Sequence, residues 1–563
     1  MTLEKEMAGN NQPFSFKTFL TINILSDSFL YMKYIFVTGG VVSGLGKGIC
    51  AASLARLLIQ RGYKVKNQKF DPYLNVDPGT MNPYQHGEVY VTEDGAETDL
   101  DLGHYERFTG NPLGKTNSIT SGKIYWNVIN RERNGGYLGR TVQIIPDVID
   151  EIKRWIYISE EENYDIAICE IGGTVGDIES SPFLEAIRQV GIDKGKDNVI
   201  YIHVPLLVEI PGTGELKSKP VQRSVKELQS LGIQPDVLVC RSTQALDEEM
   251  INKIALMCNM DKRAIIPNLT AKSIYEVPLM LEEEGLCDIV VEKLKLSKNA
   301  PDLKQWKDLV NKIRNTHHSV KIAFVGKYTE LHDSYLSIEE ALFHAATSLD
   351  TKADILWIDS AKVNENSVKE MLKEANGIII PGGFGNRGVE GMITAAKYAR
   401  ENDMPLLGIC LGMQIMVIEY ARSVLGYKDA NSTEFNEETK HPVIAMMDEQ
   451  KMIKTKGGTM RLGSYKCLLE QNSLARKLYE QDLICERHRH RYEFNITYKD
   501  QYIGNGMILC GQSPDHGLIE MVESANNSYY IGCQFHPEFK SNPLKPHPLF
   551  IGLISAILKK VNK

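Results

Sequence analysis

The sequence predicts an α/β protein with two domains, each built on a mainly parallel sheet flanked by helices. The chain of 563 residues is about twice as long as the size at which a single hydrophobic core stops growing. Two similar strand-like runs, at residues 34–38 and 321–326, each open a half in which short apolar runs alternate with helical stretches. That alternation is typical of parallel sheets with helical crossovers.

Short apolar runs predict the buried strands of both halves. They cover residues 34–38, 166–169 and 237–239 in the first half, and 321–326, 378–380 and 406–409 in the second. Alanine and leucine at residues 49–60 predict a helix directly after the first strand. The chain then divides into an extension (1–31), a first domain (32–299), a linker (300–318) and a second domain (319–563).

The linker is placed at residues 300–318 because they contain Pro301, many charges and few large apolar side chains. Its few apolar residues, at 309–313, allow a short helix. Residues 1–31 are expected to be a disordered extension or a misannotated start, because Met32 stands directly before the first strand. No small-residue cleavage site of a signal peptide follows their apolar residues.

Composition argues against several classes of protein. The chain has 64 basic and 72 acidic residues and a net charge of −8, which argues against nucleic-acid binding. No run approaches the ~18 uninterrupted apolar residues of a membrane span. The ten cysteines form no C-x-x-C pair, so we expect reduced thiols in a cytoplasmic protein, with neither disulfides nor a zinc site.

A glycine-rich loop, GGVVSGLGKG at residues 39–48, joins the first predicted strand to the first predicted helix. In such loops backbone N–H groups turn toward phosphate oxygens, the helix N-terminus adds a positive dipole, and the lysine, here Lys47, reaches the outer phosphates. The match to the P-loop pattern is imperfect. Val41 stands where the first glycine belongs, and Gly48 replaces the usual hydroxyl residue. The alternative is a glycine-rich turn that binds no ligand.

Without that hydroxyl, a metal ion at the phosphates must take its protein ligands from carboxylates elsewhere. Glu170 follows the predicted strand at 166–169, and Asp99 and Asp101 lie in an acid-rich segment. Mg²⁺ prefers such oxygen ligands. Charge alone does not separate Asp99 from Asp101, and each of these acids also fits a solvated loop. A basic stretch at 217–222 could bind a second polyphosphate, although an exposed loop is the simpler interpretation.

The second half contains a candidate cysteine nucleophile. Cys410 lies in the turn G-I-C-L-G between an apolar strand and an apolar helix, the cysteine form of a nucleophile elbow. The helix N-terminus favours the thiolate, and the glycine loop at 382–385 can direct N–H groups at an oxyanion. His536 and Glu538 share one side of an extended segment, so Glu538 can orient His536, which can activate Cys410. Each residue alone is more often structural, but together they predict acyl transfer.

These motifs resemble known families. G-I-C-L-G-M-Q, P-G-G-F-G and Q-F-H-P-E are similar to the class I glutamine amidotransferases, in which cysteine, histidine and glutamate release ammonia through a glutamyl thioester. The first half, with F-D-P-Y-L-N-V-D-P-G-T-M and E-I-G-G-T-V-G-D-I-E-S, resembles the CTP synthases, and this resemblance runs from about Met32 to the C-terminus. It implies a P-loop NTPase-like synthase domain fused to a class I glutamine amidotransferase domain.

The resemblance implies the last step of de novo CTP synthesis. ATP phosphorylates the 4-carbonyl oxygen of UTP, and ammonia from L-glutamine displaces that phosphate. The residues then expected to bind ATP are Gly44, Leu45, Gly46, Lys47, Gly48, Ile49, Asp101, Leu269, Thr270 and Ala271. Those expected to bind UTP or CTP are Ser43, Asp177, Ile178, Glu179, Lys217, Ser218, Lys219, Pro220, Val221, Gln222 and Lys253. Asp101 and Glu170 are the expected Mg²⁺ ligands, with Lys69 and Asp71 near the phosphates.

In the second half the resemblance implies that Cys410, His536 and Glu538 are catalytic. Glutamine would be bound by Gly383, Leu411, Gly412, Met413, Gln414, Glu434 and Arg491. The basic stretch departs from the family's K-T-K-P-T-Q, because Val221 replaces the second threonine. The family is typically homotetrameric, activated by GTP and inhibited by CTP, and its members can form filaments.

Two alternatives remain open on the sequence. Another P-loop glutamine-dependent amidoligase, such as one that amidates a corrinoid carboxylate, shares the phosphate loop and the amidotransferase domain but lacks the pyrimidine motifs. A non-catalytic, filament-forming relative would keep the fold, although intact Lys47, Cys410, His536 and Glu538 argue against lost catalysis.

Overall fold

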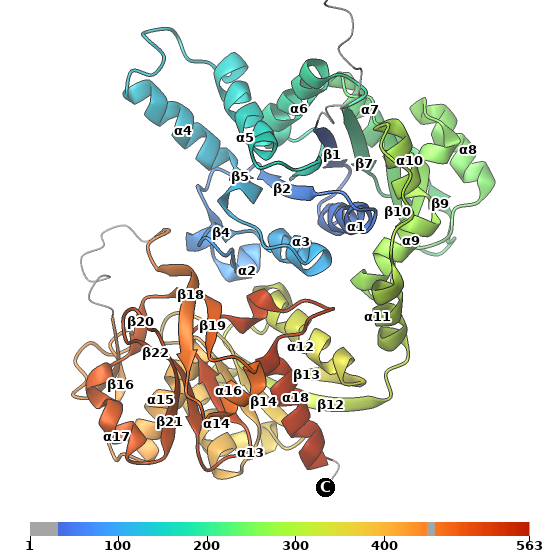
Figure 1. The fold of residues 1–563 in the computed structure, drawn as a ribbon. Coiled ribbons are helices and arrows are strands. Elements are labelled where there is room, and N and C mark those ends of the chain that lie inside the picture. The colour runs from blue at the N-terminus through green and yellow to red at the C-terminus, as the bar shows by residue number, and fades with distance from the viewer. Residues whose placement is uncertain (1–31, 447–456, 562–563) are drawn as a thin grey trace, which may run out of the picture.

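The computed structural model describes residues 32–446 and 457–561, and it confirms an α/β protein with two halves, each built around a sheet (Figure 1). The expected extension, residues 1–31, lies outside the described residues. Among the described helices, none is long and apolar enough to cross a membrane.

The first half is built on a seven-stranded sheet in which every pair of strands is parallel. In spatial order its strands are β11 (Ile265–Leu269), β10 (Val237–Ser242), β7 (Val199–Val204), β1 (Lys33–Gly39), β6 (Ile166–Ile171), β2 (Val65–Asp71) and β5 (Ser118–Thr120). The helices of this half are α1 (Lys47–Gln60), α2 (Pro83–His86), α3 (Asp101–Thr109), α4 (Ser121–Arg133), α5 (Ile149–Glu161), α6 (Ser181–Lys194), α7 (Lys219–Ser230), α8 (Glu248–Cys258), α9 (Val277–Glu283) and α10 (Leu286–Lys293). Two short hairpins complete it, β3 (Tyr90–Val91) with β4 (Glu97–Thr98), and β8 (Val208–Glu209) with β9 (Leu216–Lys217).

Both faces of this sheet are buried, which explains why its strands read as continuous apolar runs in the sequence. Alternate residues of β1 enter different cores. Ile35 and Val37 pack with α1, α9 and α10, whereas Tyr34 and Phe36 pack with α5 and α6. The carboxyl end of β1 is thereby fixed beside the start of α1, where the glycine loop lies.

The second half has a nine-stranded sheet that is mixed rather than mainly parallel. In spatial order its strands are β13 (Thr351–Asp359), β12 (His318–Gly326), β14 (Gly377–Ile380), β15 (Leu406–Ile409), β23 (Tyr530–Cys533), β22 (Ile519–Ser524), β21 (Met507–Gln512), β18 (Arg461–Leu469) and β19 (Leu483–His490). The first five strands are parallel, and the strands from β22 to β19 pair antiparallel. The predicted strands at 321–326, 378–380 and 406–409 all lie in the parallel part.

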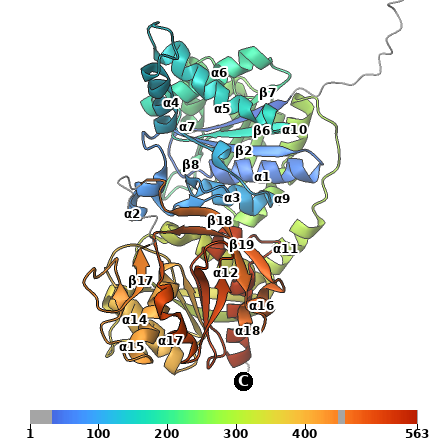
Figure 2. The ribbon, with the colours of Figure 1, turned by 60° about the vertical axis from the view of Figure 1, so that its left-hand side comes forward.

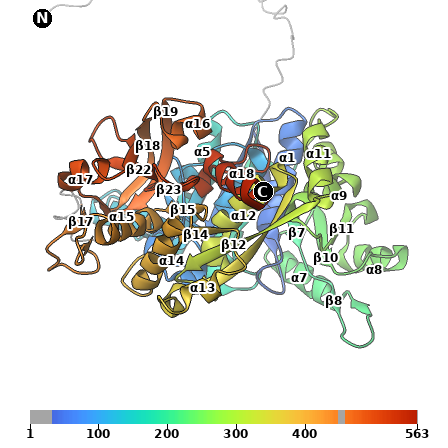
Figure 3. The same cartoon turned by 90° about the horizontal axis from the view of Figure 1, so that it is seen from below.

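Helices cover both faces of the second sheet. They are α12 (Leu336–Ser348), α13 (Val368–Met371), α14 (Val389–Glu401), α15 (Leu411–Ser423), α16 (Leu474–Tyr479), α17 (Lys499–Ile503) and α18 (Pro548–Val561). A small sheet of β16 (Asn431–Ser432), β17 (Pro442–Met446) and β20 (Tyr492–Phe494) adjoins them. In the view from below, α14 and α18 lie on opposite sides of the central strands (Figure 3).

Part of the segment expected to be a linker folds as α11 (Lys304–Arg314), at the side of the first half (Figure 1). Trp306, Leu309 and Val310 lie in the first-half core. The Trp306 indole donates to Tyr275 O at 2.8 Å, and the Arg56 guanidinium lies 4.9 Å from the centre of its ring. The amphipathic spacing of these residues thus attaches this helix to the first half.

The two halves meet along a broad interface. Strands β18 and β19 extend from the second half toward α3 of the first (Figure 2), and β19 contacts β3 of the β3–β4 hairpin. The backbones touch there, because Ser464 N donates to Glu93 O at 2.9 Å. Gly95 and Gly463 both have positive φ, and a Cβ on either would crowd the opposing backbone.

We expect Trp306→Ala to lower the free energy of unfolding by about 3–5 kcal/mol, because the variant leaves a cavity in a buried aromatic site. Gln305→Ala, an exposed position on the same helix, is the matched control and should change it by less than about 0.5 kcal/mol. Urea unfolding followed by circular dichroism measures both values. Equal, small changes in the two variants would show that α11 does not contribute to the core.

Candidate active site

The glycine-rich loop between β1 and α1 adopts the turned backbone that a phosphate loop requires. Gly44 and Gly46 have φ values of 74° and 84°. Val41, which replaces the first glycine of the usual pattern, has a φ of 81°. A β-branched residue rarely adopts this conformation, so the loop keeps the glycine geometry at the cost of local strain. The Lys47 ammonium group donates to Gly173 O at 3.0 Å.

Gly48, which replaces the hydroxyl residue of the usual P-loop pattern, has a steric explanation. A Cβ at this position would overlap the carboxylate of Asp101 and would lie 3.4 Å from Glu170 Oε2. Asp101 begins α3 and Glu170 lies near the end of β6. The two acids expected to bind Mg²⁺ therefore converge on the first turn of α1. The absence of a side chain at Gly48 makes room for them.

A buried lysine lies among these acids. The Lys69 ammonium group contacts Asp101, Glu170 Oε1 at 3.0 Å and Asp71 Oδ1 at 3.6 Å. Burial acts to lower the pKa of Lys69, but the three carboxylates together raise it well above its usual range. Burial raises the pKa of Glu170. Burial also acts to raise the pKa of Asp101, but Lys69, together with His104 and Lys47, lowers it overall. The cluster thus holds a fixed cation beside the phosphate loop.

These acids fit a magnesium ion that is shared with a phosphate. Among the described residues, no three acidic, histidine or cysteine side chains form a complete metal cage. Mg²⁺ commonly takes only one or two carboxylates and completes its shell with phosphate oxygens and water. Asp101 and Glu170 supply that number, and none of the described residues bonds the buried Asp71 Oδ2. Asp99 instead lies 3.4 Å from His86 Nε2.

The residues expected to bind the pyrimidine nucleotide differ in their exposure to solvent. Ile178, Glu179 and Lys253 are exposed, and Asp177 Oδ2 accepts a bond from Thr174 N at 2.9 Å. Val221 is buried in an apolar cluster with Val225 and Leu238, which explains why a hydroxyl is absent there. The Val221 side chain therefore serves packing. Of the remaining members of the basic stretch, Lys217 ends β9, Ser218 is the N-cap of α7, and Lys219, Pro220 and Gln222 lie in its first turn.

The last residues expected to bind ATP, Leu269 to Ala271, give less information about their ligand. Leu269 ends β11, and its carbonyl accepts a bond from the Arg241 guanidinium at 2.9 Å. Thr270 and Ala271 follow in a loop at the sheet edge. This edge is the one where β1 ends, as expected for ligand sites in parallel sheets.

Cys410 forms a strained turn between β15 and α15. Its φ of 51° and ψ of −101° are unusual for a residue with a side chain. Gly408 and Gly412 permit this turn, since a Cβ at Gly408 would lie 2.5 Å from Met416 Sδ and one at Gly412 would overlap Ile380 O. The sulfur lies 3.8 Å from Arg489 O and 3.6 Å from Gln534 Nε2. The strand, tight turn and helix that the sequence predicted around Cys410 are present.

His536 and Glu538 form the expected pair beside this sulfur. His536 Nδ1 lies 2.7 Å from Glu538 Oε1. Burial acts to lower the pKa of His536, but Glu538 and Cys410 raise it to about 10. An imidazolium next to a thiolate is the charge arrangement that activates cysteine nucleophiles. A Cβ on Gly382 would lie 3.0 Å from His536 Cε1 and 3.6 Å from Cys410 Cβ, so the glycine loop faces both groups.

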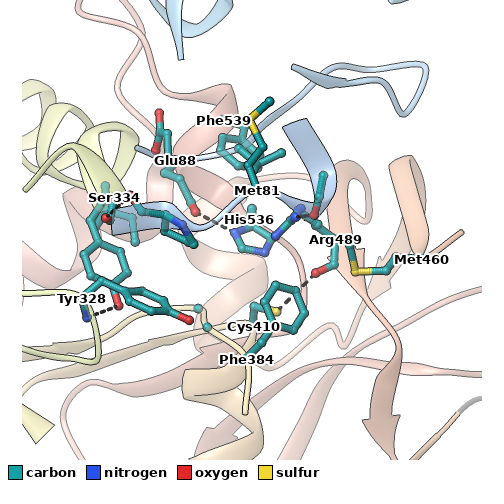
Figure 4. A pocket seen from close by; sticks show the side chains of 18 of the residues that line it. Met81, Glu88, Tyr328, Ser334, Phe384, Cys410, Met460, Arg489, His536 and Phe539 are labelled. Carbon is teal, nitrogen blue, oxygen red and sulfur yellow. Dashed lines mark hydrogen bonds and ion pairs between the residues drawn. The ribbon is translucent and has the colours of Figure 1, made fainter. Parts of the chain in front are cut away.

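A cavity of about 370 Å³ opens over these residues and is lined by both halves of the chain. Figure 4 shows Cys410, Phe384, Arg489 and His536 around it. Of the residues expected to bind glutamine, Gly383 and Arg491 line the cavity. Leu411, Gly412 and Met413 are buried in α15, and Gln414 Nε2 donates to Tyr492 O at 3.0 Å. Glu434 Oε1 accepts a bond from Gly385 N at 2.8 Å behind the glycine loop.

Comparison with known proteins identifies the family. The family description "CTP synthase N-terminus" matches residues 33–296, and "Glutamine amidotransferase class-I" matches residues 330–556. The CTP synthase of Caldanaerobacter subterraneus subsp. tengcongensis is 57% identical over 532 residues, which cover 94% of this chain and 99% of that one. The chain belongs to the CTP synthase family.

A second sequence relative agrees with this CTP synthase assignment. The CTP synthase of Clostridium kluyveri is also 57% identical, over 94% of this chain and 99% of its own. Among solved structures, the glutaminase domain of Trypanosoma brucei CTPS with bound acivicin is 38% identical. It covers 43% of this chain and 94% of its own, with a TM-score of 0.41.

The sequence motifs did not identify two residues near the cavity, Glu88 and Lys327. Glu88 lines the cavity from the first half, and burial raises its pKa to about 7 although Arg107 and Ser337 oppose the shift. The Lys327 ammonium group donates to Phe384 O at 3.2 Å and to Gly385 O, which braces the glycine loop. Lys327 directly follows β12, and a position after a parallel strand was a signal that could have found it. Glu88 has no such signal.

We expect Gly48→Ala to lower CTP synthesis by at least about tenfold with either glutamine or ammonia, an increase in the barrier of about 1.4 kcal/mol or more. The reason is that the new methyl group must displace the Asp101 carboxylate. Glutamine hydrolysis, measured in the same preparation, should change little. Unchanged CTP synthesis would show that Asp101 does not need its present position.

Proposed function

We propose that this chain converts UTP to CTP with ammonia that its own cysteine site releases from glutamine, and that ATP activates the UTP. One observation carries the proposal: a phosphate loop flanked by buried acids and a Cys–His–Glu site occur in one chain, and the cavity over the cysteine is lined by both halves. Membership of the CTP synthase family selects the substrates.

In the first half, the chain binds and orients the phosphates. Backbone N–H groups of residues 44–49 and the Lys47 ammonium hold the ATP phosphates, with Lys69 beside them. A Mg²⁺ ion held by Asp101 and Glu170 would supply charge neutralisation to the transferring phosphoryl group. Phosphorylation turns the 4-oxygen of UTP into a leaving group. This activation does not involve Cys410.

In the second half, the Cys410 thiolate attacks the side-chain carbonyl of glutamine, and N–H groups of the glycine loop stabilise the oxyanion. His536 gives its proton to the departing nitrogen, so ammonia and a glutamyl thioester form. Water, deprotonated by His536, then attacks the thioester and releases glutamate. Glu538 orients the imidazole and stabilises the imidazolium that exists before the first proton transfer and again after the second. Arg491 would pair the glutamine carboxylate and Glu434 its ammonium group, as the resemblance implies.

The same proposal covers the remaining ligands and the assembly. The pyrimidine nucleotide would contact Ser43, residues 177–179, residues 217–222 and Lys253. At Val221 the contact would come from the backbone, because its side chain is buried. GTP is the expected activator, and a homotetramer in the cytoplasm is the expected form. The rival amidoligase of another specificity is disfavoured, because the CTP synthase family description covers residues 33–296. The direct test mixes the pure protein with UTP, ATP, Mg²⁺ and glutamine and measures CTP formation.

We expect Cys410→Ala to abolish CTP synthesis from glutamine, a loss on the order of 10⁴-fold or more. Synthesis from ammonium salts should persist, because UTP activation takes place in the other half. Chromatographic measurement of CTP with each nitrogen source decides the matter. Equal loss with both sources would contradict this division of labour.

Lys47→Ala, Asp101→Ala and Glu170→Ala should show the reciprocal pattern. Each variant removes charge stabilisation at the transferring phosphoryl group, so synthesis should fall by at least about a hundredfold with either nitrogen source. Glutamine hydrolysis serves as the internal control for folding. Near-normal synthesis from ammonia in any variant would exclude that residue from the phosphate site.

A further inference from the structure

Arg487 is a buried charge of the second half whose side chain bonds to the first half. It lies on β19, and its side chain is 2% exposed. The guanidinium donates to Glu93 Oε1 at 3.1 Å, to Tyr90 OH and Val91 O at 3.0 Å, and to Glu106 Oε2 at 2.8 Å. All four acceptors belong to residues 90–106. One planar fork of donors therefore joins β19 to the β3–β4 hairpin and α3.

The backbone of the same arginine holds the catalytic histidine. His536 N donates to Arg487 O at 2.8 Å. The atom that fixes the backbone of His536 and the guanidinium that binds the first half thus belong to one residue. A displacement of the first half would act on Arg487 and hence on His536.

Tyr90 holds the other end of the histidine segment. Its hydroxyl lies 3.0 Å from Phe539 O, with Glu106 Oε2 at 2.8 Å as a second acceptor for its proton, and its ring centre lies 4.9 Å from that of Phe539. The Phe539 ring in turn stacks on His536, with centres 5.2 Å apart and planes at 16°. Phe539 also belongs to the apolar core of the first half. Residues 536–539 are therefore held on both sides by groups that Tyr90 contacts.

We propose that Arg487 and Tyr90 are positioning residues for glutamine hydrolysis: they hold His536 against Cys410 through contacts that exist only while the two halves are docked. This inference rests on the proposed function of Cys410 and His536. Glutamine hydrolysis would then depend on the first half, although none of the residues that activate UTP takes part in the hydrolysis. These contacts would confine ammonia release to the form of the enzyme in which the two halves are docked.

Arg487→Met and Tyr90→Phe in the full-length protein test the proposal. The first variant removes the fork, and the second removes one hydroxyl while keeping the ring. We expect kcat for glutamine hydrolysis to fall at least about tenfold in Arg487→Met and about threefold in Tyr90→Phe, with KM for glutamine within about twofold, because positioning acts on the transition state. Synthesis of CTP from ammonium salts should stay within about twofold of the unchanged protein.

Tyr275→Phe is the matched control. Tyr275 is also fully buried, and its hydroxyl also bonds across the interface, to Glu340 and to His344 Nε2 at 2.6 Å on α12. It should leave kcat for glutamine hydrolysis within about twofold. Four outcomes would each overturn the proposal. Two concern the test variants: no loss of glutamine hydrolysis in Arg487→Met and Tyr90→Phe, or a rise in KM for glutamine without a fall in kcat. The others are an equal loss in Tyr275→Phe and a parallel loss of ammonia-dependent CTP synthesis in the test variants. Absence of CTP from the unchanged protein with both nitrogen sources would instead contradict the proposed function.

Discussion

Two buried cations hold the functional parts of this chain in place, because charges removed from water must be paired. Lys69 lies among Asp71, Asp101 and Glu170 beside the phosphate loop. Arg487 lies among acceptors of the opposite half. Leaving a buried ion without its partner costs several kcal/mol, so each cation fixes the positions of the carboxylates around it. Lys69 organises the acids of the proposed phosphate site, and Arg487 joins that half of the molecule to the half that contains Cys410.

Close backbone approach is the second constraint. Gly48 admits Asp101 to the first turn of α1, and Gly408 and Gly412 admit the turn that carries Cys410. In both places the absence of a side chain on a glycine leaves room for a functional group, the Asp101 carboxylate or the Cys410 thiol, at the carboxyl edge of a parallel sheet. That edge is where α/β folds place ligands. The two halves thus build different chemistry from the same arrangement of strand, tight turn and helix.

Much of the fold and of the site could be predicted because their signals are local. The strands β1, β6, β10, β12, β14 and β15 coincide with apolar runs, since sheets buried on both faces need such runs. The antiparallel strands between residues 461 and 524 lacked that signal, and the second sheet is accordingly mixed. The linker helix α11 was visible only as three apolar residues, whose burial depends on the first-half core.

By itself, the sequence determined which segments carry the proposed chemistry, because the glycine loop with Lys47 and the turn with Cys410 are continuous segments with recognisable residue types. Only the tertiary structure decided how these segments are combined. Val41 adopts a glycine conformation, Val221 is buried, and Tyr90 meets Arg487 across 397 positions of the chain. Contacts at such separations depend on the docking of two completed sheets, and no local pattern of residues encodes that docking.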